Sequence, residues 1–157
     1  MKRFTFIFPT ATLTMTVTCD NEMTVYVDGS LEVSNNDWQT VSTVTLSTVP
    51  ILVAIHCTDL HVVEGILAHF SDGQGTDDSW KCSHEYETDW NQPGFDDSAW
   101  EQAREIEQYP EGGWGTRVGM SGNPYWIWAE THDGHPAEAF CRKVIKGKAP
   151  LSQQLSR

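Results

Sequence analysis

The sequence lacks any apolar run long enough to cross a membrane. Its longest such stretch, Pro50 to Ile55, falls far short of the roughly 20 residues that a membrane-spanning helix needs. Basic residues are also scarce, because 10 Lys and Arg stand against 22 Asp and Glu, which gives a formal net charge of −12. A surface of that sign repels phosphate, so the composition argues against nucleic acid as a partner.

Motifs for common catalytic chemistry are missing too. The chain contains no G-x-S-x-G, H-E-x-x-H, P-loop or G-x-G-x-x-G pattern, and no C-x-x-C pair of the kind found in zinc or redox sites. His132 and His135 could share a soft metal ion, although such a run is also typical of a solvated turn. We therefore expect a non-enzymatic protein, with a catalytic site assembled from distant residues as the less favoured alternative.

The 157 residues and the 39% hydrophobic content fit one folded domain. We place this domain at residues 1–145 and predict a flexible C-terminal tail at 146–157, where Gly, Lys, Pro, Ser and Gln dominate. Residues 1–8 resemble the start of an export signal but lack its long hydrophobic core and cleavage site. We expect either that a leader has been removed or that the chain is one piece of a longer secreted protein.

The first half of the sequence alternates with a period of two, as β-strands do. From Leu13 to Cys19 the apolar residues occupy the odd positions and threonines occupy the even ones. A second alternating stretch ends at Asp28-Gly29, which is a strong hairpin signal. The capping-box pattern Ser98-Ala99-Trp100-Glu101 predicts one short helix that runs to about Gln108. Strands are expected at 13–19, 23–27, 31–33, 41–49, 51–57, 65–70, 80–86, 125–129 and 137–145.

The four cysteines are an even number and lie far apart in the sequence. This pattern favours two disulfides and an oxidising compartment, with four buried free thiols in a cytosolic protein as the alternative. Cys19 shares the odd-numbered apolar face of its strand, and Cys57 shares the apolar face of the strand 51–57. Because both faces should point into the same core, we predict a Cys19–Cys57 disulfide.

Four segments, in order along the chain, resemble one family. They are DNEMTVYVDG at 20–29, TDDSWKCS at 76–83, GFDDSAW at 94–100, and WIW at 126–128 with FCR at 140–142. The set is similar to galactose-binding-domain-like jelly rolls, which include the sandwich modules attached to bacterial α-L-rhamnosidases and modules of secreted invertebrate proteins. Asp28 departs from the family's usual Asn, a change that a turn tolerates.

The resemblance implies a fold and sugar binding, but it carries no hydrolase activity, since the chain has no attached catalytic barrel. It also implies a disulfide between Cys82, which follows SWK, and Cys141, which lies in FCR. Asp20 and Asn21 match the position at which rhamnose-binding relatives use an Asp-Asn pair with a calcium ion.

Tryptophan supplies the flat apolar face that sugar recognition uses. Trp80 and Trp100 are expected in the core, whereas Trp38 and Trp114 lie in polar or glycine-rich loops, where core packing and ligand contact are equally good explanations. Asp20 and Asn21 are the first candidate calcium ligands. The acidic loop residues Asp72, Asp77, Asp78, Asp96 and Asp97 are further candidates, although turns and caps ordinarily contain such residues.

The sequence therefore predicts an all-β, antiparallel β-sandwich of jelly-roll topology, with about eight strands and one short helix. The expected function is an extracellular, non-catalytic, lectin-like module that binds carbohydrate or glycoprotein through Trp38, Trp114, Asp20 and Asn21, with calcium as a candidate cofactor. The alternative is a structural or adhesive extracellular domain with protein or mineral partners, which the net charge of −12 favours.

Overall fold

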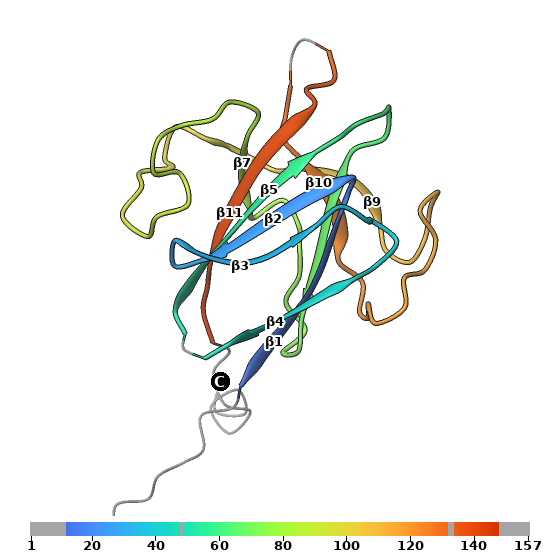
Figure 1. Cartoon of the computed structure of the whole chain (residues 1–157), viewed down its shortest axis with the longest axis horizontal. Helices are drawn as coiled ribbons and strands as arrows, with labels where there is room; N and C mark the ends of the chain where they lie inside the picture. The colour runs from blue at the N-terminus through green and yellow to red at the C-terminus, as the bar shows by residue number, and fades with distance from the viewer. Residues whose placement is uncertain (1–11, 48, 132–133, 148–157) are drawn as a thin grey trace, which may run out of the picture.

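The computed structural model describes residues 12–47, 49–131 and 134–147, and in this part of the chain it contains eleven β-strands and no helix. The strands form two antiparallel sheets that pack as a β-sandwich compatible with a jelly roll, as the sequence predicts (Figure 1). The five-stranded sheet has the order β4 (Ser42–Leu46), β1 (Leu13–Asp20), β6 (Gly65–Phe70), β10 (Tyr125–Trp128), β9 (Arg104–Gln108). The six-stranded sheet has the order β3 (Ser30–Asn35), β2 (Glu22–Val27), β5 (Ile51–Thr58), β11 (Glu138–Ile145), β7 (Lys81–Ser83), β8 (Glu101–Gln102).

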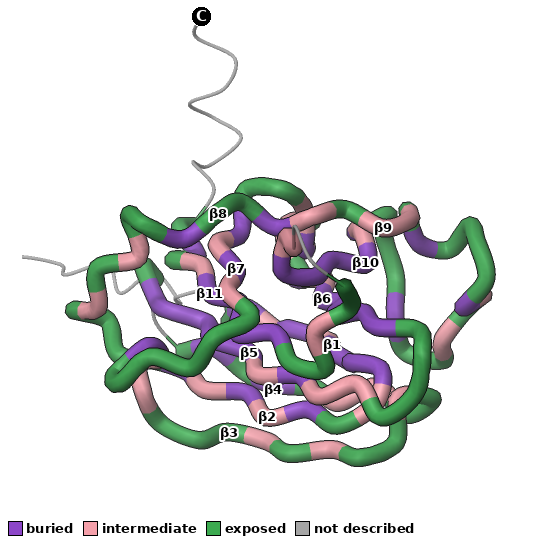
Figure 2. Tube along the Cα trace, turned by 90° about the horizontal axis from the view of Figure 1, so that it is seen from above, coloured by how far each residue is buried: buried purple, intermediate pink, exposed green. Residues whose placement is uncertain are grey.

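The core lies between the sheets and follows the predicted alternation. The apolar side chains of β1 at odd positions, from Leu13 to Cys19, are buried, and those of β5 face them from the other sheet. Figure 2 shows buried residues along the strands and exposed residues on most of the connections. Asp28 and Gly29 both have positive φ, which is the geometry of the predicted hairpin turn between β2 and β3.

Both predicted disulfides are present. Cys19 of β1 is bonded to Cys57 of β5, with their Cα atoms 6.1 Å apart, so this bridge joins the two sheets. Cys82 and Cys141 are directly paired positions on the neighbouring strands β7 and β11 and form the second bridge. Two disulfides are consistent with an oxidising compartment.

The predicted helix from Ser98 to about Gln108 is wrong. Instead of capping a helix, Ser98 donates its main-chain N–H to the Asp96 side chain, and the chain turns so that Trp100 N–H bonds to Asp97 O. Residues 101–108 then form β8 and β9, which pair with β7 and β10 in different sheets. Pairing with those strands overrides a capping signal that is only local.

Two long connections cover the outer faces of the sandwich, at the left and the right of Figure 1. Residues 84–100, called here the 84–100 segment, place Trp90 and Trp100 against Ala54 and Phe140 on the six-stranded sheet. Residues 109–124, the 109–124 segment, place aromatic side chains on the five-stranded sheet. Trp80 and Trp100 are buried, as expected.

Within the described residues, no helix is long and apolar enough to span a membrane. Residues 1–11 and all but Lys146 and Gly147 of the predicted C-terminal tail lie outside the described part of the chain. The division into a domain at 1–145 and a tail therefore stays a prediction.

Candidate functional site

Asp20 and Asn21 form the corner where β1 of one sheet passes into β2 of the other. Asn21 N–H donates to Thr58 O at 3.0 Å, and Asn21 Oδ1 accepts the main-chain N–H of Leu60 at 2.8 Å. Asp20 pairs with Gly65 of β6. These contacts fix the corner to both ends of the β5–β6 connection.

The Asp20 carboxylate is buried, with 7% of the residue exposed. Its Oδ2 accepts the indole N–H of Trp114 at 3.1 Å, and its Oδ1 accepts the side-chain amide of Asn21. Burial raises the pKa of Asp20 above its ordinary value, and the hydrogen bond from Trp114 opposes that rise. The carboxylate is thus held by neutral N–H groups rather than by an ion pair.

Trp38 and Trp114 both lie beside this corner, so the structure brings the four predicted site residues to one end of the sandwich. Trp114 is only 9% exposed and stacks on Trp126, with ring centroids 4.6 Å apart. The guanidinium of Arg117 lies 4.2 Å from the Trp38 ring centroid and donates to Trp114 O. Each ring therefore has a protein group stacked on it. Sugar contact by either ring stays a prediction.

The predicted calcium ligands Asp20 and Asn21 already use their side-chain oxygens in hydrogen bonds. Calcium is bound by several oxygen ligands, whereas here Asp20 Oδ1, Asp20 Oδ2 and Asn21 Oδ1 each accept an N–H donor. An ion at this corner would share these oxygens with their N–H donors, and calcium binding there stays a prediction. Among the described residues, no group of three or more His, Cys, Asp or Glu side chains could hold a metal ion.

Four of the five other acidic loop residues take part in turns or pairs, and Asp78 contributes its main-chain N–H, which donates to Glu105 Oε1 at 3.0 Å. The Oδ1 atoms of Asp72, Asp77 and Asp96 each accept the main-chain N–H two residues further on. Asp97 pairs with Arg142 at 2.5 Å. Of the two candidate histidines, His132 lies outside the described residues, and the side chain of His135 is 82% exposed and 3.5 Å from Glu64.

A depression of about 580 Å³ lies elsewhere, between the connection that follows β6 and the residues that lead into β10. We call it the Tyr125 depression. Its lining includes His69, Gln74, Asp77, Asn123, Tyr125 and Lys143. It combines one aromatic ring with side chains that can donate or accept hydrogen bonds.

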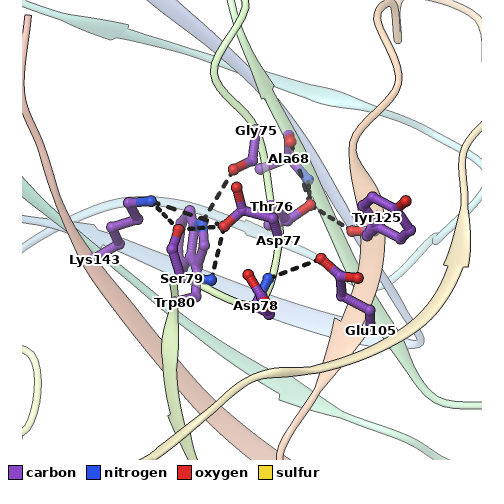
Figure 3. Close-up of polar contacts among 10 residues, drawn as sticks. All are labelled: Ala68, Gly75, Thr76, Asp77, Asp78, Ser79, Trp80, Glu105, Tyr125 and Lys143. Atoms are coloured by element: carbon purple, nitrogen blue, oxygen red, sulfur yellow. Dashed lines mark hydrogen bonds and ion pairs between the residues drawn. The ribbon is translucent and has the colours of Figure 1, made fainter.

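Thr76 builds this depression by joining β6 to β10 (Figure 3). Its buried hydroxyl donates to Tyr125 O at 2.6 Å and accepts the main-chain N–H of Ala68 at 3.1 Å. The Thr76 main chain adds two more bonds, from its N–H to Ala68 O at 2.9 Å and from Tyr125 N–H to Thr76 O at 2.8 Å. The positions of Tyr125 and the neighbouring Asp77 are thereby fixed to the sheet rather than left to a loose loop.

Three polar groups of the Tyr125 depression have no hydrogen-bond partner among the described residues. They are Asp77 Oδ2, the side-chain amide of Asn123 and the hydroxyl of Tyr125. Asp77 Oδ1, in contrast, accepts the Ser79 N–H at 2.9 Å, and Lys143 Nζ donates to Ser79 Oγ. Figure 3 shows this Asp77, Ser79 and Lys143 contact at one side.

Sequence reasoning named Asp77 as an acidic loop residue but missed Asn123 and Tyr125. The segment TDDSWKCS at 76–83 marks the part of the depression that Thr76 and Asp77 form. Asn123 and Tyr125 are more than forty positions away in the sequence, and no periodicity or spacing connects them to it. Comparisons of the chain with family models, curated proteins and solved structures find no match.

Proposed function

We propose that this chain is an extracellular, non-catalytic module that binds carbohydrate, with the Tyr125 depression as its ligand site. The observation that carries the proposal is the set of three unpartnered polar groups on Asp77, Asn123 and Tyr125 around one half-buried aromatic ring. A free carboxylate oxygen accepts hydrogen bonds from sugar hydroxyls, an amide both donates and accepts, and a ring packs against the apolar face of a pyranose. The depression is half open, and its lining is about equally polar and apolar, which suits a pyranose with its hydroxyl groups and its apolar face.

The lining also supports binding without catalysis. Glycoside hydrolysis usually needs two carboxyl groups placed about 5 to 10 Å apart on either side of the scissile bond. Asp77 is the only acidic residue in the described lining of the Tyr125 depression. A sugar bound there would meet one carboxylate and no second acid.

The extracellular location and the closer family assignment belong to the same proposal. Two disulfides support a secreted protein, because cytosolic thiols are usually kept reduced. The two antiparallel sheets suit a galactose-binding-domain-like jelly roll, which the DNEMTVYVDG and WIW segments resemble. The resemblance makes methyl α-L-rhamnopyranoside and methyl β-D-galactopyranoside the first probes.

The test is a glycan array followed by calorimetric titration with these two glycosides and with any saccharide that the array retains. Asn123→Ala and Tyr125→Phe, which remove the free amide and the free hydroxyl, should each weaken binding about tenfold or more, as expected when a sugar hydroxyl loses its partner. Gln39→Ala, an exposed change in the β3–β4 connection, is the matched control and should bind as the unaltered chain does. An empty array, or unchanged affinity in both variants, would overturn the proposal.

A second candidate function is a structural or adhesive extracellular domain with protein or mineral partners. The net charge of −12 favours it, because such a surface attracts cations and basic partners. This function predicts diffuse, low-affinity calcium uptake at many sites and no sugar binding. Calorimetry with calcium chloride, run beside the glycoside titrations, separates the two functions.

A further inference from the structure

A second depression, of about 590 Å³, lies in the 84–100 segment. It is lined by Thr88, Asp89, Gln92, Gly94, Phe95 and Asp96, and we call it the Phe95 depression. It shares no lining residue with the Tyr125 depression. The 84–100 segment packs on the outer face of the six-stranded sheet, whereas the Tyr125 depression borders β6 and β10 of the five-stranded sheet.

The wall of the Phe95 depression is held from below by a buried cation. Arg142 of β11 is 3% exposed and donates to Gln92 O at 3.0 Å and to Phe95 O at 3.2 Å. Its guanidinium also pairs with Asp97 and lies 5.2 Å from the Phe95 ring centroid. Turns from Asp89 to Gln92 and from Gln92 to Phe95 complete the wall. The segment is therefore preorganised, which lowers the entropic cost of binding.

The Phe95 depression shares two kinds of polar group with the Tyr125 depression, a free carboxylate oxygen and a free hydroxyl, and differs in that its side-chain amide donates to a neighbouring residue. The Asp89 carboxylate and the Thr88 hydroxyl have no hydrogen-bond partner among the described residues, whereas Asp96 accepts hydrogen bonds from the main chain and the side chain of Ser98. Phe95 contributes a half-buried aromatic ring. The Phe95 depression, like the Tyr125 depression, is therefore lined by a free carboxylate, a free hydroxyl and an aromatic residue.

A related turn, one residue longer in the second case, lies beside each depression. In Asp77-Asp78-Ser79-Trp80 and in Asp96-Asp97-Ser98-Ala99-Trp100, the first Asp accepts the Ser N–H, at 2.9 and 3.0 Å. The Trp N–H donates to the main-chain oxygen of the first Asp in one turn and of the second Asp in the other, and both Trp rings are buried. The first Asp of each turn lines its depression. Two related turns thus each place a carboxylate in the lining of a depression that also contains an aromatic residue.

We propose that the Phe95 depression is a second, independent carbohydrate site, so that one chain binds two sugars and can cross-link a multivalent glycan. This inference rests on the proposed function. A bivalent monomer joins two glycan-bearing particles through a single chain, whereas a monomer with one site only coats them.

The test uses beads that carry α-L-rhamnoside or β-D-galactoside, and it scores protein capture and bead clumping separately. We expect the unaltered chain to be captured and to clump the beads. One variant, Asn123→Ala, alters the first site, and a double variant, Thr88→Val with Asp89→Asn, alters the second. Either variant should reduce capture about twofold and abolish clumping. The chain that carries all three substitutions should not be captured. Asn tolerates the positive φ of 62° at position 89. Glu85→Gln removes one charge in the same segment outside the depression and should leave both readouts unchanged.

Two results would overturn the inference. Clumping that persists in the Thr88→Val, Asp89→Asn variant would show that the second site is not needed for cross-linking, as in an oligomer with one site per chain. Complete loss of capture in Asn123→Ala alone would show that only one site exists. The unaltered chain failing to be captured on either bead would instead contradict the proposed function, and the inference with it.

Discussion

The 84–100 segment and the 109–124 segment both pack on the outer face of a sheet, but the first contacts a buried cation and the second a buried carboxylate. Each buries at least one tryptophan on the outer face of one sheet and contacts a charged strand residue that follows a disulfide cysteine. In the first segment that residue is Arg142, which pairs with the carboxylate of Asp97. In the second it is Asp20, whose carboxylate meets the indole N–H of Trp114. The 84–100 segment is thus anchored by an ion pair and the 109–124 segment by a hydrogen bond to a buried charge.

The largest expected effect concerns the two disulfides, which lie next to these anchors. Cys19–Cys57 and Cys82–Cys141 span 38 and 59 residues, so removal of either should lower the free energy of unfolding by about 4 kcal/mol. Urea denaturation of the double variants Cys19→Ser with Cys57→Ser and Cys82→Ser with Cys141→Ser measures both values. A loss of less than about 1 kcal/mol for either pair would contradict the account that chain constraint stabilises this small domain.

Arg142 contacts the 84–100 segment and Arg117 lies in the 109–124 segment, and their substitution by alanine should lower the free energy of unfolding by different amounts. Arg142→Ala leaves Asp97 and two main-chain oxygens without their donor, so it should cost about 3 kcal/mol, the lower end for a buried pair because Asp97 is partly exposed. Arg117→Ala loses the stack on Trp38 and the hydrogen bonds to Trp114 O and Thr116 O but breaks no ion pair, so it should cost less, about 1 kcal/mol. Denaturation of both variants gives the comparison. Equal losses would show that the Arg142 pair has no special role.

Backbone requirements also distinguish the segments. Gly112 of the 109–124 segment has φ of 90°, and a Cβ there would lie 2.0 Å from the Glu107 carboxylate, so Gly112→Ala should cost about 2 kcal/mol. Gly113→Ala, at the next position, and Gly94→Ala, in the other segment, meet no atom within 4 Å and serve as controls. Thermal unfolding should show a shift for Gly112→Ala alone. A shift of the same size in Gly113→Ala would indicate general sensitivity of the turn.

The smallest expected effect is a difference between the pKa values of two carboxyl groups, Asp20 and Asp96. Burial raises the pKa of Asp20 above 3.8, whereas hydrogen bonds from Ser98 lower the pKa of Asp96 below it. Asp96 therefore contributes stability that is present above pH 3.8 and is lost as the pH falls through its lowered pKa. Asp20 acts in the opposite sense, since its folded form takes up a proton first and gains stability as the pH falls from its raised pKa toward 3.8. Carboxyl ¹³C NMR should give the two midpoints in that order.

The central core could be predicted from the sequence because the alternation of apolar and polar residues within one strand shows which side chains face inward. The period of two from Leu13 to Cys19 places Cys19 on the core side, and the same reasoning for Cys57 leads to the disulfide that joins β1 to β5. The Cys82–Cys141 bridge followed from the family resemblance alone. The segment 98–108 was mispredicted because its capping pattern is local, whereas β8 and β9 depend on distant partners.

The outer clusters and the depressions could not be predicted in this way. Trp90, Trp114 and Phe95 lie in irregular segments, where no period shows which sheet an aromatic ring will cover. Asn123 and Asp77 line the same depression, next to the point where Thr76 joins β6 to β10. Their position in loops makes Trp38 and Trp114 candidates for ligand contact, and in the structure Arg117 stacks on the Trp38 ring and Trp126 on the Trp114 ring.

A titration followed by ¹⁵N NMR tests the central claim most directly, because the Asn123 side-chain amide and the indole N–H groups are separate signals in one spectrum. Methyl α-L-rhamnopyranoside or methyl β-D-galactopyranoside should shift the signal of the Asn123 side-chain amide. The indole N–H signals of Trp38 and Trp114 should not move. Shifts at those two indoles with a static Asn123 amide would contradict the account and return the ligand site to the Asp20 corner.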